Sequence, residues 1–393
     1  MKNGKKRLDI AMIGHGFMGR AHSNAIHQVG HFFDIPYDLR LKVICGRDRS
    51  NLEAVAAQWG WEETAGDWQS VVERKDIDVV DICTPNRFHA PIAVAAAQAG
   101  KIVLCEKPLA MNLEEAQIMA AAARNVPNLV WFNYRRVPAI ALAKRLMNEG
   151  KLGKIYHYRA TYLQSWGPDP VPEGAWRFNI AEAGSGAVGD LLSHSVDLAL
   201  WLNGEVSEVS SVVQTFAPGR EVDDAVLVLA RFANGSIGSF EATRYAIGCR
   251  NRNCLEIHGS KGAVRFDLED LNRLEVFDVD DPPHVQGSHR VLVTGPGHPY
   301  VDRFWPPGHI IGYEHTFSAT LADFLQCLER NEPFHANFDD GVEVHRILEA
   351  VDKSWRSKSW ELVPEKTGRA RPDVVNTARR RDSSQVVSQQ ERS

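Results

Sequence analysis

Glu106, Lys107 and Pro108 follow directly after a short apolar run, Ile102 to Leu104, which predicts a β-strand. Side chains just beyond the carboxyl end of a strand face the crevice in which open α/β sheets bind their ligands. A lysine there, followed by a proline that fixes the turn, is poorly placed for core packing and well placed to reach a ligand. The alternative is an ordinary surface turn, so the interpretation depends on the rest of the chain.

A second group of polar side chains lies farther along the chain. Asp190, His194 and Asp197 are spaced by four and three residues, which places them on one face of a helix predicted from about Val188. Histidine transfers protons near neutral pH, and a carboxylate one turn earlier can orient it. The helix N-terminus disfavours the imidazolium form of His194, whereas Asp190 opposes that effect. The alternative is a capped amphipathic helix with a solvated His194.

A glycine loop is the first element that would position these groups. Leu8 to Ile13 predicts a strand that leads into Gly14, Gly16 and Gly19, the pattern G-x-G-x-x-G at the start of a predicted helix. The first glycine permits a tight turn, the second lets the backbone approach a pyrophosphate, and the third lets helix and strand pack closely. Because a helix N-terminus also offers unpaired N–H groups to an anion, the pattern predicts a dinucleotide site.

The identity of the dinucleotide depends on the end of the next predicted strand, Leu41 to Cys45. An acidic residue here usually binds the adenosine ribose of NAD, but Gly46 takes this place and Arg47 follows. A small residue next to an arginine leaves room and charge for the 2′-phosphate of NADP. Asp48 or the backbone can serve the ribose of NAD instead, so NAD and NADP both stay open.

A third strand, Val79 to Cys83, ends in Thr84, Pro85 and Asn86, and a helix follows from about Pro91 to Ala99. Strands and helices that alternate at this spacing predict a parallel sheet with helices on both faces.

Later segments predict a second sheet, because successive strands are joined by turns. The strands are expected at residues 154–162, 206–216, 225–232, 236–243, 254–258 and 263–268, and helices at about 314–330 and 341–353. Asn234 and Gly235 form a tight hairpin signal. The fold class is therefore α/β: an N-terminal Rossmann dinucleotide-binding domain and a C-terminal α+β domain with a large, mostly antiparallel open sheet.

Length and composition indicate how many domains to expect and which class of protein this is. At 393 residues it is long for one core, so we expect domains over 1–137 and 138–366 and a disordered polar tail over 367–393. The hydrophobic content of 44% and charged content of 24% are typical of a soluble globular protein. No apolar run has membrane-spanning length. A net charge of −5 does not fit the basic surface that nucleic-acid-binding proteins present. Neither a membrane nor a nucleic acid is expected as a partner.

The six cysteines show no C-x-x-C spacing, and Cys45, Cys83 and Cys105 lie in or at the ends of predicted strands. Reduced core cysteines indicate a cytoplasmic location and argue against a zinc site. Segment 281–312 holds four histidines whose spacing matches no ligand pattern, so no metal is expected. A loop this long is often functional, and we interpret it as a candidate lid over a bound ligand.

Together these motifs resemble the Gfo/Idh/MocA family of sugar and cyclitol oxidoreductases over roughly residues 8 to 360. The resemblance rests on the glycine loop, on residues 84–86 with His89, on residues 99–108, and on the Asp190, His194 and Asp197 group. Finer features resemble the levoglucosan dehydrogenases and related glycoside 3-dehydrogenases in this family. They lie at residues 17–23, 132–136, 161–164, 176–178 and 295–300, and at Trp166.

The resemblance implies a role for each matching residue. Lys107 would stabilise the developing oxyanion of the reacting hydroxyl, His194 would exchange its proton as general base or acid, and Asp190 would orient or assist. Lys107–Pro108 would be a cis peptide. Cofactor-binding residues would be Gly14, Gly16, Phe17, Met18, Gly19, Gly46, Arg47, Asp48, Thr84, Pro85, Asn86, His89, Glu106 and Lys107. Substrate-binding residues would be Tyr134, Arg135, Trp166, Trp176, Arg177, Tyr300 and Trp305.

The implied activity is hydride transfer between a secondary hydroxyl, at C3 of a pyranose sugar, anhydrosugar or glycoside, and NAD or NADP. Three alternatives stay open: glycoside cleavage through transient C3 oxidation by a retained NAD, inositol dehydrogenation, and non-catalytic sugar sensing. Retention of Lys107, Asp190 and His194 together argues against a sensor. Members of the family commonly associate through the open sheet, so we expect a homodimer or homotetramer. The alternative is a monomer whose own helices cover that sheet.

Overall fold

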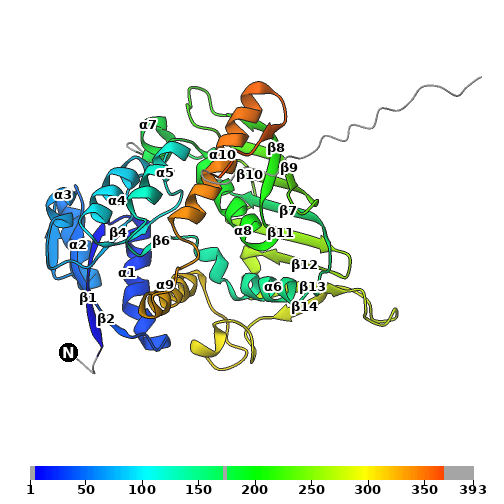
Figure 1. Cartoon of the computed structure of the whole chain (residues 1–393), viewed down its shortest axis with the longest axis horizontal. Coiled ribbons are helices and arrows are strands. Elements are labelled where there is room, and N and C mark those ends of the chain that lie inside the picture. Colours follow the sequence, from blue (N-terminus) through cyan, green and yellow to red (C-terminus); the bar gives the residue numbers. More distant parts are fainter. Residues whose placement is uncertain (1–4, 171–174, 367–393) are drawn as a thin grey trace, which may run out of the picture. The chain divides into compact units, whose positions relative to one another are not determined.

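A parallel sheet forms the first part of the chain. The structure, a computed structural model, describes residues 5–170 and 175–366, and the predicted polar tail lies outside these ranges. Within them the first sheet has six strands in the order β3-β2-β1-β4-β5-β6 (Figure 1). The strands are β1 (Lys6–Ile13), β2 (Tyr37–Cys45), β3 (Glu63–Ala65), β4 (Val79–Ile82), β5 (Ile102–Cys105) and β6 (Asn128–Val130). The order reverses between β1 and β4, the point where such sheets bind ligands.

Helices connect these strands and cover both faces of the sheet. All four side chains of β4 are buried, and because they alternate between the two faces, both faces must be covered. They are α1 (Phe17–Phe32), α2 (Arg49–Trp59), α3 (Trp68–Val72), α4 (His89–Gln98) and α5 (Leu113–Ala122). Asp48, Asp67 and Asn112 cap α2, α3 and α5 by accepting hydrogen bonds from backbone N–H groups. Helix α1 begins differently, because its N-cap is Gly16, which has no side chain to offer.

The second sheet has nine strands in the described residues, in the order β14-β13-β12-β11-β7-β10-β9-β8-β15. The strands are β7 (Ile155–Leu163), β8 (Val206–Gln214), β9 (Ala225–Phe232), β10 (Ile237–Thr243), β11 (Arg252–Gly259), β12 (Gly262–Asp267), β13 (Arg273–Asp278), β14 (His289–Leu292) and β15 (Glu361–Leu362). Strands β7 and β10 pair in parallel, and the other neighbours pair antiparallel. The predicted fold class is confirmed.

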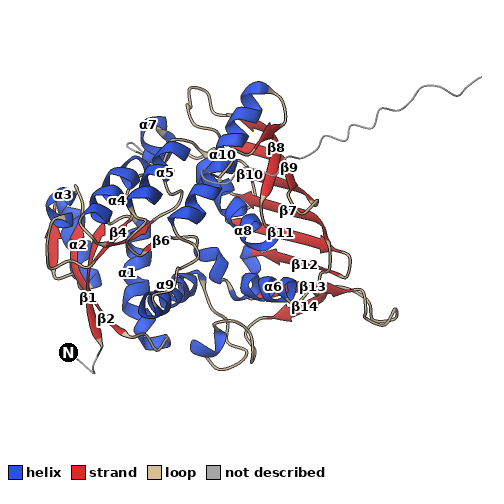
Figure 2. Ribbon diagram, viewed as in Figure 1, coloured by secondary structure: helices blue, strands red, loops and turns tan. Residues whose placement is uncertain are grey.

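Helices pack against one face of this second sheet (Figure 2). They are α6 (Pro138–Asn148), α8 (Ser193–Asn203) and α10 (Phe338–Ser357). Strand β9 shows the resulting alternation: Val226 and Val228 are buried, whereas Leu227 and Leu229 are more than half exposed. The opposite face of the sheet is therefore left open by the residues that the structure describes.

The last helices return to the first sheet. Helix α9 (Tyr313–Arg330) contacts α1, and α10 contacts α5. Between them, the Ala336 carbonyl accepts a 2.9 Å hydrogen bond from the Val130 N–H at the edge strand β6. The Phe338 N–H donates to Asn128 Oδ1 at 2.7 Å. The predicted boundary at residue 137 falls just before α6, and it stays a prediction.

Two local features differ from the sequence prediction. Segment 281–312 is not a single loop, because it contains β14 and a short 3-10 helix, Val301–Arg303. The helix predicted from Val188 begins as a π-helical turn, η4 (Val188–Leu192), before it continues as α8. The remaining short helices are η1 (Asn86–Phe88), η2 (Asn133–Arg136), η3 (Trp176–Phe178), α7 (Ile180–Ala183) and η5 (Leu268–Asp270).

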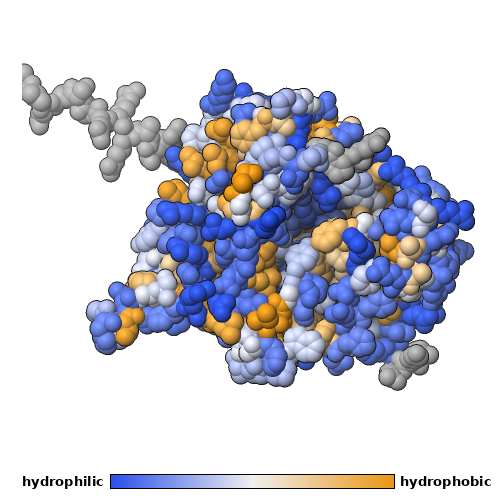
Figure 3. Space-filling model, turned by 180° about the vertical axis from the view of Figure 1, so that it is seen from behind, coloured by the Kyte–Doolittle hydropathy of each residue, from blue (hydrophilic) through white to orange (hydrophobic). Residues whose placement is uncertain are grey.

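The surface is mixed in character. In the space-filling view from behind, hydrophilic residues cover most of the visible face and hydrophobic residues form separate patches (Figure 3). Among the residues that the structure describes, each helix is too short or too polar to span a lipid bilayer.

Candidate active site

The glycine loop forms a cradle with no room for side chains at two of its positions. A Cβ atom at Gly14 would overlap the carbonyl oxygen of Cys83, and one at Gly19 would overlap the carbonyl oxygen of Gly14. Gly14 also has a φ of +108°, which favours glycine. A Cβ atom at Gly16 would meet nothing within 4 Å, because this residue borders open space at the start of α1. The first N–H groups of α1 can therefore receive an anion.

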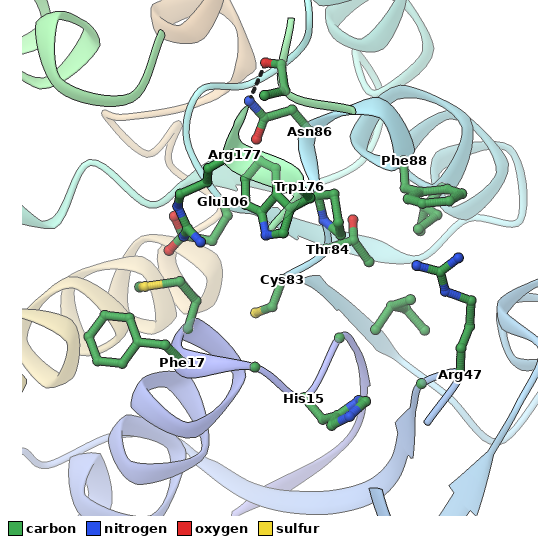
Figure 4. Close-up of a pocket in the computed structure, with 18 of the residues that line it drawn as sticks. His15, Phe17, Arg47, Cys83, Thr84, Asn86, Phe88, Glu106, Trp176 and Arg177 are labelled. Carbon is green, nitrogen blue, oxygen red and sulfur yellow. Dashed lines mark hydrogen bonds between the residues drawn. The ribbon is translucent and has the colours of Figure 1, made fainter. Parts of the chain in front are cut away.

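A cavity of about 690 Å³ opens in front of this loop, at the carboxyl ends of β1, β2, β4 and β5. Most of the residues predicted to bind a cofactor line it: Gly14, Gly16, Phe17, Met18, Gly46, Arg47, Asp48, Thr84, Pro85, Asn86, Glu106 and Lys107. Figure 4 shows Cys83 and Trp176 near its centre, and Asn86 fixed by a 2.8 Å hydrogen bond to the Ala183 carbonyl. The glycine cradle and the N-terminus of α1 fit the pyrophosphate of a dinucleotide.

One end of this cavity is bounded by His15, Gly46, Arg47 and Asp48. A Cβ atom at Gly46 would overlap the His15 ring, so an acidic residue at position 46 would require that ring to move. Asp48 caps α2 through the Asn51 N–H, and the Arg47 guanidinium lies 5.7 Å from the centre of the Phe88 ring (Figure 4). A cation and a carboxylate thus lie at the same end, which leaves NAD and NADP both open.

A second cavity of about 980 Å³ adjoins the first. Its lining includes Tyr134, Trp166 and His194, which were predicted to act on or bind a substrate. Seven residues line both cavities and form what we call the shared wall: Phe17, Met18, Glu106, Lys107, Trp176, Arg177 and Asp190. A ligand in either cavity would therefore reach the same lysine and carboxylates.

Lys107 and Asp190 meet in the shared wall. The Lys107 Nζ lies 2.9 Å from Asp190 Oδ1 and 3.0 Å from the Asp190 carbonyl oxygen. The other carboxylate oxygen, Oδ2, accepts a 2.9 Å bond from the guanidinium of Arg244. The π-helical turn η4 places Asp190 here, and Asp223 fixes the start of that turn by accepting from the Gly186 and Val188 N–H groups.

Charge and burial set the protonation of this cluster. Burial would raise the pKa of Asp190, but Lys107 and Arg244 outweigh it and hold the pKa well below its usual range. Burial lowers the pKa of His194, and the charge of Lys107 lowers it further against the opposing effect of Asp190. At neutral pH the histidine is therefore neutral and able to accept a proton.

His194 lies among aromatic side chains on the second cavity. Its ring centre is 4.6 Å from that of Tyr134 and 5.8 Å from that of Tyr162. The Tyr134 hydroxyl lies 2.9 Å from the Tyr162 hydroxyl, which donates to Asn251 Oδ1 at 2.9 Å. This chain of hydroxyls gives the cavity a polar side that a hydroxylated ligand can use.

The Lys107–Pro108 peptide is cis, as the resemblance implies. His89 lies behind this turn, within 3.0 Å of the Pro108 carbonyl and 3.1 Å of the Thr84 carbonyl, and is fully buried. It does not line either cavity, so the structure gives it a supporting position behind the cofactor-binding residues.

Three predicted substrate residues do not reach the cavities and require correction. Arg135 is buried and forms ion pairs with Asp197 at 2.6 Å and Asp340 at 3.3 Å, because a buried guanidinium needs carboxylate partners. Tyr300 donates to Asp323 at 2.8 Å. Trp305 packs edge-on against Phe32 of α1, with ring centres 5.3 Å apart, so neither aromatic side chain lines the two cavities as the sequence predicted.

The partner of Arg135 also changes the interpretation of Asp197. Burial raises the pKa of Asp197 to about 6 even though Arg135 opposes the change. Asp190, in the π-helical turn η4, lines both cavities, while Asp197 in α8 accepts from the buried Arg135. Asp197 therefore serves as the buried carboxylate partner of Arg135, and it does not belong to the cluster of Asp190 and His194.

Sequence reasoning missed Arg244, Tyr162, Gln164 and Asn251, which line the cavities. Arg244 is 1% exposed, and its guanidinium lies 4.7 Å from the centre of the Trp166 ring. It directly follows strand β10, whose sequence, Ile237–Thr243, gives no local signal for a ligand-binding arginine.

A parallel sheet with a glycine cradle, joined to a lysine, aspartate and histidine cluster, defines a dinucleotide-dependent oxidoreductase. Comparison with known proteins agrees. Residues 8–134 match the oxidoreductase family with an NAD-binding Rossmann fold, and residues 140–265 match the GFO/IDH/MocA C-terminal domain. The chain belongs to the Gfo/Idh/MocA family of oxidoreductases.

Individual relatives cover nearly the whole chain. Levoglucosan dehydrogenase of Pseudarthrobacter phenanthrenivorans is 40% identical over 92% of this chain and 99% of its own. A solved structure of levoglucosan dehydrogenase with NADH and levoglucosan is 42% identical, has a TM-score of 0.89, and covers 91% of this chain and 100% of its own. An oxidoreductase domain protein from Kribbella flavida is 45% identical with a TM-score of 0.88, over 92% of this chain and 100% of its own.

Proposed function

We propose that this protein oxidises a secondary hydroxyl, at C3 of a pyranose sugar, anhydrosugar or glycoside, and transfers the hydride to NAD. The observation that carries the proposal is the shared wall, in which Lys107 and Asp190 border both cavities and His194 lies on the second. The likeness to levoglucosan dehydrogenase supports an anhydrosugar or a related pyranose as the substrate.

A bound nicotinamide supplies the acceptor for the carbon-bound hydride, so the chain itself must orient the alcohol and remove its proton. Lys107 donates a hydrogen bond to the reacting oxygen and stabilises the charge that develops there. His194, neutral at neutral pH, accepts the hydroxyl proton. Asp190 holds the Lys107 ammonium at 2.9 Å, and Arg244 holds Asp190 from the other side.

The rest of the second cavity suits a sugar ring. Trp166 and Trp176 line it and offer faces on which the apolar side of a pyranose can stack. Arg177 and the Tyr162 hydroxyl add hydrogen-bonding groups for the remaining ring hydroxyls. NAD is the proposed cofactor because similar structures hold NADH, and Arg47 makes NADP the alternative.

The test mixes the purified protein with NAD or NADP and a panel of anhydrosugars, pyranoses, glycosides and inositols. We expect the absorbance of the reduced nicotinamide to rise with NAD and one pyranose class, and not with that sugar blocked at C3. Lys107→Met should abolish the rise, whereas Lys75→Met, on the exposed surface, should not. Cleavage of a glycoside substrate without net reduction of added NAD would indicate the retained-cofactor alternative. A rise with inositols alone would contradict the proposed substrate.

We also propose that copies of the chain associate through the open face of the second sheet, as a homodimer or homotetramer. Val212, Leu227, Leu229 and Ile237 are each more than half exposed on the described strands β8 to β10. Exposed apolar patches on a sheet face mark association surfaces. The six cysteines are free thiols, which supports the cytoplasm as the proposed location.

A further inference from the structure

A buried line of charged groups lies directly beneath the shared wall. His22, in the second turn of α1, has one ring nitrogen, Nδ1, 3.0 Å from Asp81 Oδ2 and the other, Nε2, 3.0 Å from Glu106 Oε1. His22 and Asp81 are 0% exposed and Glu106 is 4% exposed. Of the three, Glu106 alone lines the cavities. The histidine therefore joins a carboxylate of the core to one that reaches the ligand.

The remaining oxygens of both carboxylates are already bonded. The Trp131 indole N–H donates to Asp81 Oδ1 at 3.0 Å, and the Lys107 backbone N–H donates to Glu106 Oε2 at 3.1 Å. Each ring nitrogen of His22 thus faces a carboxylate oxygen that can only accept while it is ionised. An imidazolium, with a proton on both nitrogens, satisfies both contacts at once.

The surroundings of His22 agree with a charged ring. Burial would lower the pKa of His22, but the charge of Asp81 and the contacts with Asp81 and Cys83 outweigh this effect and hold the pKa well above its usual value. The other groups around the ring are the Cys83 thiol at 3.1 Å and the aromatic rings of Trp131 and Phe317. Burial raises the pKa of Cys83 to about 12, so this neighbour carries no charge at neutral pH.

We propose that His22 is a buried imidazolium that keeps Glu106 ionised and fixed in the shared wall, and so favours the positively charged oxidised nicotinamide over the neutral reduced one. Asp81 completes the line by holding the second ring nitrogen. Asp81, His22 and Glu106 together carry one net negative charge, presented at Glu106. His22 is a positioning residue, since it acts through Glu106. The second half of the proposal rests on the proposed function, which puts a nicotinamide cofactor against this wall.

The same side chains suggest one competing interpretation. His22, Asp81 and Cys83 offer ligand atoms within 4.8 Å of one another, a geometry that could hold a metal ion. Here the Nδ1 of His22 lies 3.0 Å from Asp81 Oδ2 and is already engaged by that carboxylate. Metal analysis of the purified protein separates the two: one equivalent of zinc would overturn the proposal.

The protonation of His22 can be measured without any cofactor. In protein labelled with ¹⁵N at histidine, we expect both ring nitrogens of His22 to keep the chemical shifts of an imidazolium from about pH 6 to about pH 9. His22→Gln assigns the signals, and His27→Gln, an exposed histidine on the same helix, is the matched control. If the His22 ring is neutral at pH 7 in the wild-type protein, the proposal is overturned. This measurement uses wild type, so it stands even if the His22→Gln variant fails to fold.

Binding measurements test the effect on the cofactor. Dissociation constants for NAD⁺ and NADH are measured by fluorescence titration of wild type, His22→Gln and His27→Gln. Without the cation, burial favours a proton on one of the two carboxylates. In His22→Gln we expect NAD⁺ to lose about tenfold in affinity relative to NADH near pH 6.5, with recovery toward pH 9.

The outcomes separate the two proposals. An unchanged ratio, or tighter NAD⁺ binding in His22→Gln, would mean that Glu106 stays ionised without His22 and would overturn the inference. Failure of wild type to bind either nucleotide would overturn the proposed function, and with it the effect on the cofactor, while the ¹⁵N measurement would still report the charge of His22.

Discussion

Gly16 and Gly19 belong to the same glycine motif, yet the structure predicts that the same substitution has different effects on stability at the two positions. A methyl group at Gly16 would meet no atom within 4 Å, and the residue has a φ of −71°, which alanine adopts freely. Alanine is a poorer N-cap than glycine by several tenths of a kcal/mol, but it restricts the unfolded chain by about 0.4–1 kcal/mol. Gly16→Ala should therefore leave the free energy of unfolding within about 1 kcal/mol of wild type.

Gly16→Ala should instead weaken the binding of the dinucleotide. The added methyl group lies where a pyrophosphate would approach the N–H groups of α1. Loss of one charge-assisted hydrogen bond costs about 1.5–3 kcal/mol, which weakens the dissociation constant about 10- to 150-fold. Urea unfolding measures the stability, and fluorescence titration with NADH measures the binding.

Gly19→Ala is the matched comparison. Its methyl group would overlap the Gly14 carbonyl oxygen and lie 3.2 Å from the Met12 sulfur, so α1 must move away from β1. Overpacking of this kind costs about 1–3 kcal/mol, and binding should weaken as well. If Gly16→Ala binds NADH like wild type, the cavity in front of α1 is not the pyrophosphate site. If Gly16→Ala unfolds as readily as Gly19→Ala, the open space around Gly16 does not protect stability, and the packing argument is refuted.

Three further predictions concern protons and association. In Asp190→Asn the pKa of His194 should fall further in an NMR titration, because the carboxylate opposes burial and Lys107; a rise would contradict the electrostatic account. Burial lowers the pKa of His345 to about 4 against an unfolded value near 6.5, so stability is complete above about pH 6.5 and falls by about 3 kcal/mol as the pH drops toward 4. In His345→Gln, the free energy of unfolding measured in urea should no longer fall with pH in this range. An unchanged pH dependence would show that His345 is not its source. Leu229→Asp, at a side chain 56% exposed on the open sheet face, should shift sedimentation toward the monomer; an unchanged profile would place the interface elsewhere.

The first sheet and its ligand-binding edge could be predicted from local signals. Gly14, Gly16 and Gly19 follow one predicted strand at a fixed spacing, and Lys107 follows another. The neighbouring residues alone therefore place each motif at the ligand-binding edge of the sheet. The cis peptide and the shared site of Lys107 and Asp190 came from the family resemblance, because nothing in either segment alone brings them together. Their ion pair became visible only in the structure.

The errors have a physical cause in partners far along the chain. Arg135 follows Tyr134 directly, but a one-residue step turns its side chain toward Asp197 and Asp340, which lie 62 and 205 residues away in the sequence. The π-helical turn at Asp190 also escapes prediction, since the five residues Val188–Leu192 are too few to show a period that differs from that of an α-helix.

The return of α9 and α10 to the first sheet has a consequence for the order of folding during synthesis. A nascent chain that has emerged to residue 137 contains every strand of the first sheet. However, the partners of α1, α5 and the edge strand β6 are still to be made, since they lie at Tyr313–Arg330, Phe338–Ser357 and Ala336. The glycine cradle can therefore form early on the ribosome, but its supporting helices gain their final cover only when the last part of the described chain arrives. Expression of residues 1–137 alone should yield an aggregation-prone fragment that exposes the apolar side of α1.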